Sequence, residues 1–187
     1  MDNRSHQPTS KTSPAIFALQ LLCLSIAFVS VSCQGHQPHQ PIRLEEMTPR
    51  GYVNDFAGII DARSQSQMEA LCRDADKNMD TQIVLVTVAS LTGRSPEDFA
   101  LQLGNRWGIG HKGSNRGVLV LLAPNEHKWR IEIGYGLTSI LPDNLVKSIG
   151  DAMTPLLQRG DYGGASLLVI KRIIQVTQSG LSHNSGS

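Results

Sequence analysis

The sequence predicts an α/β fold, in which a small sheet is covered by amphipathic helices. Two apolar runs rich in β-branched residues, 82–89 and 117–122, are of strand length and are bounded by turn residues. Other segments carry apolar residues at the spacing of one helical face. A third strand is indicated at 129–133, where apolar and charged residues alternate.

Length, composition and charge indicate a single globular domain that does not bind nucleic acid. The 187 residues, 40% hydrophobic and 18% charged, suit one globular domain with appendages. The 17 basic and 16 acidic residues nearly balance, and 15 of each remain once the segment before Cys33 is removed. A basic excess of the kind that binds nucleic acid is therefore absent from the sequence.

The first 33 residues resemble an export signal. Arg4 and Lys11 precede the apolar stretch 15–31, which ends beside Cys33. The stretch is slightly shorter than the roughly 20 residues that a helix needs to span a membrane. We therefore expect the signal to be removed after export, and the alternative is that it is retained as a membrane anchor. Cys33 resembles a bacterial lipobox cysteine, although Ser30 stands where leucine is usual. We expect a protein on the periplasmic side of a bacterial membrane, either tethered or secreted.

Residues 34–50 are predicted to be a flexible linker, because prolines, glutamines and histidines have little to bury. The domain itself is expected at 51–178. It opens with the sequence VNDFAG at 53–58, which reads as a turn closed by Asn54 or Asp55. An amphipathic helix follows at 61–79, and its lone cysteine, Cys72, is expected to be a small core residue.

The middle of the chain combines a helix with a loop and a hairpin. Ser95 and Pro96 are a helix-start signal, and the helix should run to Trp107. The glycine-rich segment 108–113 matches the glycine spacing of a dinucleotide-binding motif. In such a motif the glycines follow a strand and open a helix, whereas here they follow a predicted helix and precede a predicted strand. We therefore expect a loop and no nucleotide. Residues 123–128 supply the turn between the strands 117–122 and 129–133.

The last third of the chain is predicted to be helical. Gly134 to Gly136 should end the third strand, after which Pro142 can open a helix through 157 that carries Asp143 and Asn144 in its first turn. After a break near Gly160, the length of the apolar segment 165–178 favours a helix over a strand. The tail 179–187 is expected to be disordered.

Six short motifs follow one another in a fixed order between residues 51 and 178: VNDFAG at 53–58, RWGIG at 106–110, GVL at 117–119, IEIGYG at 131–136, LPD at 141–143 and GDY at 160–162. In this order they resemble the TPM domain family. The resemblance implies a three-layer α/β/α sandwich around a small mixed sheet, in the bacterial envelope or thylakoid lumen. It also implies divalent-metal binding and weak acid phosphatase activity, as in some members, while other relatives resemble assembly, repair or auxiliary factors for membrane proteins.

The candidate site is rich in oxygen and contains no thiolate. We expect polar groups to gather at one rim of the sheet, where Asp55 and Asp143 would meet; the predicted ligands are Asp55, Asp143, Asn54, Asn115 and Asn144. Oxygen ligands suit Ca²⁺ or Mg²⁺. Local chemistry alone also explains Asp55 as a turn residue and Asp143 as a helix-start acid, whereas the resemblance favours both as ligands.

Two functions remain open from the sequence. Many TPM relatives carry asparagine where this chain has Arg116, so Arg116 and Lys112 are candidate contacts for an anionic ligand. A metal-assisted phosphatase would use such cations to neutralise a phosphoryl group. However, the sequence contains no familiar hydrolase motif and no evident nucleophile. We therefore predict a metal-binding module that docks an envelope membrane protein, with a weak acid phosphatase as the alternative.

Overall fold

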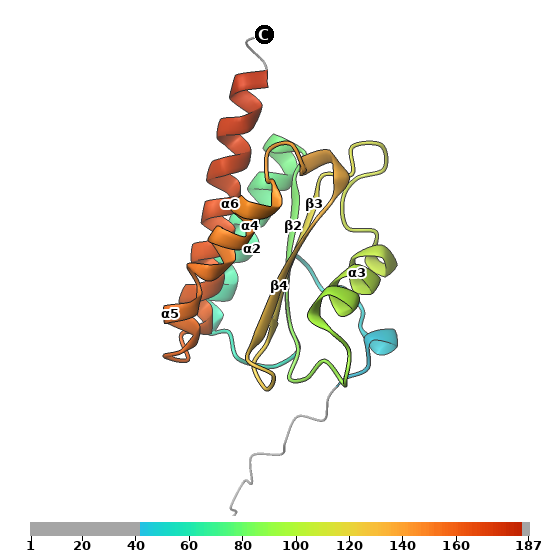
Figure 1. The fold of residues 1–187 in the computed structure, drawn as a ribbon, viewed down its shortest axis with the longest axis vertical. Helices are drawn as coiled ribbons and strands as arrows, with labels where there is room; N and C mark the ends of the chain where they lie inside the picture. The colour runs from blue at the N-terminus through green and yellow to red at the C-terminus, as the bar shows by residue number, and fades with distance from the viewer. Residues whose placement is uncertain (1–41, 185–187) are drawn as a thin grey trace, which may run out of the picture. The chain divides into compact units, whose positions relative to one another are not determined.

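The computed structural model describes residues 42–184 and contains one four-stranded sheet with the strand order β1-β2-β3-β4 (Figure 1). The strands are β1 (Val53–Asp55), β2 (Gln82–Thr87), β3 (Gly117–Ala123) and β4 (Lys128–Ile133). β1, β2 and β3 are parallel, whereas β4 returns antiparallel beside β3. The predicted small mixed sheet is confirmed, and β1 is a short additional strand in a segment expected to be only a turn.

Helices cover both faces of the sheet, which confirms the three-layer sandwich (Figure 1). One face is covered by four helices: α2 (Ala62–Met79), α4 (Asp143–Asp151), α5 (Thr154–Leu157) and α6 (Tyr162–Asn184). The other face is covered by α3 (Pro96–Trp107) and the short 3₁₀ helix η1 (Leu44–Glu46). A second 3₁₀ helix, η2 (Tyr135–Leu137), follows β4.

Strand alternation divides the core into two clusters. Ile83 and Leu85 of β2 point toward α2 and α6, while Val84 and Val86 point toward α3. Every residue of β3 is buried. Successive side chains of a strand point to opposite faces, so a strand between two helical layers must be apolar throughout. The predicted burial of both faces of these strands is confirmed.

Side-chain caps begin α3 and α2, whereas α4, which follows Pro142, has no side-chain cap. The Ser95 hydroxyl accepts a hydrogen bond from the backbone N–H of Asp98 at 3.1 Å, with Pro96 at the first helical position. The Asp61 carboxylate accepts from Ser64 N–H at 2.9 Å, and hydrogen bonding from Ser64 lowers the pKa of Asp61. These acceptors satisfy backbone donors that the first turn of a helix leaves free.

Three boundaries differ from the sequence-based expectation. The helix expected at 142–157 is two helices, α4 and α5, because Pro155 cannot donate the backbone bond needed in a helix interior and stands instead in the first turn of α5. Residues 42–50 are not free linker, since Leu44 and Met47 are buried and Trp107 Nε1 donates to Met47 O at 3.2 Å. α6 continues through residues 179–184, a segment expected to be disordered.

The predicted export signal, the lipidation of Cys33 and residues 34–41 of the predicted linker lie outside the described residues. Within residues 42–184, no helix is both long enough and apolar enough to cross a membrane.

Candidate functional site

Asp55 lies at the end of the sheet where β1, β2 and β3 finish, which we call the carboxyl end. Its carboxylate accepts hydrogen bonds from the backbone N–H groups of Ile59, at 3.1 Å, and Ile60, at 2.9 Å. It also accepts one from the hydroxyl of buried Thr87, at the end of β2. Asp55 therefore closes the turn after β1, as the local reading of the sequence predicts.

Asn54 has an equally local role. Its side chain is buried, its oxygen accepts from Arg50 N–H at 2.7 Å, and its amide donates to Gly51 O at 3.0 Å. Both ends of the side-chain amide thus bind the loop that leads into β1. The hydrogen bonds of Asn54 and Asp55 hold the chain on either side of a strand of only three residues.

Asp143 and Asn144 lie in the first turn of α4, and both are exposed. α4 packs beside β4, and Asp143 lines a groove with residues of that strand. β1 and β4 are the opposite edges of the sheet. At about 4.8 Å between neighbouring strands, the two edges are roughly 14 Å apart, which is far beyond the reach of one ion that binds oxygen at about 2.4 Å.

The expectation that Asp55 and Asp143 meet at one rim is therefore wrong. The period-2 and helical patterns place each residue on its element, but they do not state the order of strands in the sheet. β4 runs antiparallel and ends opposite the start of β3, with Ile133 beside Val118. The turn after β4 thus lies at the end where the parallel strands begin, which we call the amino end.

Asn115 and Arg116 lie at this amino end, just before β3. Asn115 is exposed, has a left-handed backbone with φ of 49°, and its carbonyl accepts from Gly136 N–H at 3.1 Å. The Arg116 guanidinium donates to Asp80 O, Met79 O and Thr81 Oγ1 at 3.0–3.3 Å. Arg116 therefore caps the carboxyl end of α2. Lys112 is exposed in the preceding loop.

The predicted metal ligands consequently form two groups and do not fit one ion. Asn54 and Asp55 are hydrogen-bonded at the carboxyl end, whereas Asn115, Asp143 and Asn144 are exposed toward the amino end. Within residues 42–184, no three His, Cys, Asp or Glu side chains are grouped to hold a metal ion. The Ca²⁺ or Mg²⁺ prediction stays a prediction, and no chemical step is derived from it.

A groove of about 350 Å³ opens at the amino end between α3 and the end of β4. We call it the amino-end groove; its lining includes Leu101, Asn105, Ile109, Asn115, Tyr135 and Thr138. Leu101 is 50% exposed and Tyr135 is 88% exposed. They are the two exposed large hydrophobic side chains of the part of the chain that the structure describes, and both line this groove.

Two glycines let the wall of this groove form. A Cβ atom at Gly134 would collide with the carbonyl oxygen of Asn115, and one at Gly136 with that of Ser114. The turn after β4 therefore lies directly against the loop before β3. Close backbone approach of this kind needs residues without side chains. Tyr135, between the two glycines, is held at the surface by this packing.

Sequence reasoning missed Leu101 and Tyr135 as functional candidates. The sequence pattern presents Tyr135 only as part of the glycine turn that ends a strand. Leu101 lies off the apolar stripe formed by Phe99 and Leu103 on α3, so a leucine on the otherwise polar face was the available signal.

Cys72 is fully buried on α2, and burial raises the pKa of its thiol to about 12. A thiol with such a pKa stays protonated at neutral pH, whereas the thiolate is the nucleophile. The prediction of a small core residue is confirmed.

Comparison with known proteins gives consistent matches. The profile of the TPM domain matches residues 53–176, which is more than half of the chain. Two chloroplastic UPF0603 proteins of Oryza sativa, from the subspecies indica and japonica, are each 26% identical over 125 residues. That alignment covers 65% of this chain but only 42% of each relative. The chain thus spans less than half the length of the curated relatives it matches.

Solved structures share the fold. The N-terminal domain of a protein from P. gingivalis, solved by NMR, has a TM-score of 0.70 and 27% identity, covering 76% of this chain and 96% of that one. An N-terminal domain from Corynebacterium glutamicum has a TM-score of 0.55 and 21% identity, covering 75% and 86%. The BA42 protein of Bizionia argentinensis has a TM-score of 0.57 and 16% identity, covering 64% and 82%. With the profile match, these findings show that the chain belongs to the TPM domain family.

Proposed function

We propose that this chain is an exported binding module that docks a membrane protein of the cell envelope through the amino-end groove, and so assists its assembly or repair. One observation carries the proposal. The two exposed large hydrophobic side chains within residues 42–184, Leu101 and Tyr135, line the same groove although they come from different elements. Aromatic residues are enriched where proteins contact partners, and they often supply much of the binding energy.

The surroundings of the groove suit a peptide or loop as the ligand. Asn105 and Asn115 are exposed polar residues beside the apolar pair, so amide groups stand next to hydrophobic surface. Protein interfaces combine an apolar centre with a polar rim in the same way. A partner segment that carries an apolar side chain, flanked by backbone groups able to hydrogen-bond with these asparagines, matches this chemistry.

Two further observations support an extracytoplasmic setting. The segment before Cys33 has the composition of an export signal. The Oryza sativa relatives are named as chloroplastic proteins. The proposal places this chain on the periplasmic side of a bacterial membrane, held by a lipid at Cys33 or by a retained signal, so that the groove meets membrane proteins from that side.

A photo-crosslinking experiment in cells tests the groove. A photoreactive amino acid replaces Tyr135 in one version of the full chain and Arg73, which is exposed on α2 at the other face of the sheet, in a control version. We expect defined membrane-protein adducts from position 135 and none from position 73. Leu101→Ala, combined with the label at position 135, should reduce those adducts. Equal labelling from both positions would contradict the groove as a docking site.

An activity assay on the purified protein distinguishes a binding module from a phosphatase. The purified protein should hydrolyse a generic phosphomonoester well below the ~1 to 10³ s⁻¹ of ordinary enzymes. Turnover in the ordinary range that falls about 10²-fold in Lys112→Ala or Asp143→Ala, with the fold intact, would replace the binding proposal with a phosphatase.

A further inference from the structure

The outer edge of β4 presents backbone hydrogen-bonding groups away from the sheet. Gly134 N–H donates to Gly117 O at 2.8 Å. This bond shows which residues of β4 direct their backbone groups toward β3, since the two strands are antiparallel. Backbone groups of alternate residues point to opposite sides of a strand. Lys128, Arg130 and Glu132 therefore face β3 with their backbone groups. Those of Trp129, Ile131 and Ile133 face outward.

This edge is partly open, because Trp129 and Ile133 are half-buried whereas Ile131 between them is buried. A groove of about 430 Å³ runs along it between α3 and α4, with Glu97 of α3 on one side and Lys147 of α4 on the other. Figure 1 shows β4 in front, between these two helices. Among residues 42–184, no hydrogen bond joins another element to the outward backbone groups of β4. An unpaired edge of this kind is a template for another strand.

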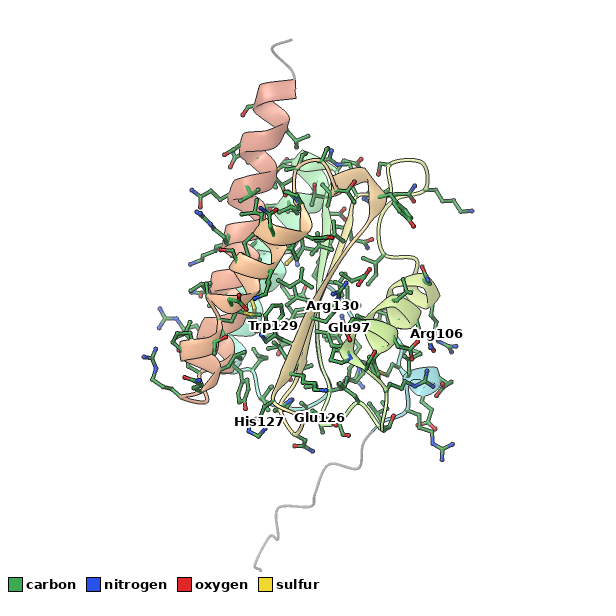
Figure 2. The ribbon with its side chains drawn as sticks, viewed as in Figure 1. Glu97, Arg106, Glu126, His127, Trp129 and Arg130 are labelled. Carbon is green, nitrogen blue, oxygen red and sulfur yellow. The ribbon has the colours of Figure 1, made fainter. Side chains whose placement is uncertain are left out.

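Side chains of β4 are separated by face. Trp129 and Ile131 contribute to the core beneath α4 and α6, and a Cβ atom at Gly150 of α4 would collide with the Trp129 ring. Arg130 and Glu132 lie on the α3 side and bind each other, with nitrogen–oxygen distances of 2.8 and 3.0 Å. Figure 2 shows Trp129 to the left of β4, and Arg130 with Glu97 to its right. One face of the strand is thus apolar, and the other carries two basic residues, Lys128 and Arg130, and one acid, Glu132.

The sequence of β4 is complementary to itself when two copies run antiparallel about a two-fold axis through Ile131. In that register Trp129 lies opposite Ile133 of the second copy, and Arg130 lies opposite Glu132 of the second copy. The outward residues face one another, so about six backbone hydrogen bonds can form. Opposite charges directly across a strand pair stabilise it.

Charge also selects this register over its neighbours. Moving the axis to position 130 keeps outward groups facing each other and pairs Lys128 with Glu132 of the second copy, but it places Arg130 opposite Arg130 of the second copy. Moving it to position 132 places Glu132 opposite Glu132 of the second copy. Like charges directly across a strand pair destabilise it. Only the register centred on Ile131 forms two pairs of opposite charges without any pair of like charges.

We propose that β4 is a self-association edge, through which two copies of this chain join their four-stranded sheets into one continuous sheet. The interface is isologous, as expected for a symmetric dimer. It uses the strand edge and not Leu101 or Tyr135, although Glu132 and Ile133 also line the amino-end groove. Variants at Arg130 and variants at Leu101 or Tyr135 therefore allow this proposal and the proposed docking function to fail separately. Dimerisation would place two amino-end grooves on one assembly, and a partner that engages both would be bound more tightly than by one alone.

Charge-reversal variants test the pairing. The full chain is studied by sedimentation equilibrium in one non-ionic detergent, so that any association through the apolar stretch 15–31 is common to all variants. Arg130→Glu and Glu132→Arg should each weaken self-association about tenfold or more, because each places like charges opposite each other twice. Lys171→Glu, an exposed change of the same charge on α6, is the matched control and should leave association unchanged.

Mixing the two single variants gives the sharpest result. Arg130→Glu supplies two acids and Glu132→Arg supplies two bases, so every charged position across a mixed pair is opposite in sign. We expect a heterodimer at least as stable as the wild-type dimer, and recovery of self-association in the double variant Arg130→Glu/Glu132→Arg. Circular dichroism confirms that each variant is folded. A change in folding alone would not make two weakened variants bind each other.

Two results would overturn the proposal. One is a wild-type chain that stays monomeric at the highest concentration reached, which would leave the β4 edge to a strand from another protein. The other is a dimer that responds equally to Lys171→Glu and Arg130→Glu, or variants that do not associate when mixed, because such a dimer would use another surface.

Discussion

Polar residues have different roles at the two ends of the sheet. At the carboxyl end, Asp55 accepts three hydrogen bonds from its own chain and Asn54 uses both its donor and its acceptor. Toward the amino end, Asn115 and Asp143 are exposed, and Tyr135, which lines a groove with Asn115, is 88% exposed. The more conspicuous acid in the sequence, Asp55, therefore belongs to the end that holds the fold together.

This difference shows that an acidic residue after a predicted strand can have either of two roles. A carboxylate after a strand can bind an ion, or it can satisfy the backbone donors of the turn that comes next. At Asp55 the backbone donors are the observed partners. Exposed groups toward the amino end are free to contact a ligand. Stability measurements should therefore respond to changes at the carboxyl end, and binding measurements to changes at the amino end.

The largest expected effect is on stability. Asp55→Ala removes the acceptor for Ile59 N–H, Ile60 N–H and the Thr87 hydroxyl. Partly buried donors without partners are costly, so we expect the free energy of unfolding in urea to fall by about 3 kcal/mol. Asp55→Asn keeps one acceptor oxygen and should lose about half as much.

The matched change at the amino end is Tyr135→Ala, which should alter the unfolding free energy by no more than about 0.5 kcal/mol, because the ring is exposed. Equal losses in Asp55→Ala and Tyr135→Ala would break the contrast between the two ends.

A smaller effect concerns pH. The Tyr52 hydroxyl donates to Asp76 at 2.7 Å, and this hydrogen bond, with burial second, raises the pKa of Tyr52 from 10.0 to about 12. The folded state therefore holds the phenol proton more tightly than the unfolded state. The contribution to stability is complete below pH 10 and is lost as the pH rises through about 12.

The comparison variant for this effect is Tyr52→Phe. Urea unfolding at a series of pH values should show that the stability advantage of the wild type over Tyr52→Phe is constant below pH 10 and shrinks between pH 10 and about 12. An advantage that does not change across this range would show that the hydrogen bond to Asp76 is not maintained in solution.

The smallest expected effect is a set of amide shifts on calcium titration. If the exposed oxygens toward the amino end hold a cation, NMR signals of Asn115, Thr138 and Asp143 should move, and Asp143→Asn should reduce the movement. Few carboxylates are present, so binding should be weak. Shifts at Ile59 and Ile60 that disappear in Asp55→Asn would instead place the ion at the carboxyl end.

Sequence pattern alone was enough for most of the secondary structure, because the signals are local. Ser95 followed by Pro96 marks a helix start within one turn, and the run 117–122 is apolar enough to show that it lies between two layers. The turn role of Asp55 was also readable, since its two backbone partners are four and five residues away. Ordered family motifs added the sandwich architecture.

Tertiary structure decided which of these residues meet. The strand order and the reversed direction of β4 separate Asp55 from Asp143 and deliver Tyr135 to the side of Leu101. Arg116 binds the carbonyl groups of Met79 and Asp80, 37 and 36 residues earlier in the chain. The free edge of β4 likewise results from the absence of a fifth strand beside it among residues 42–184. Such contacts join residues far apart in sequence, and neither periodicity nor capping signals carry information over that distance.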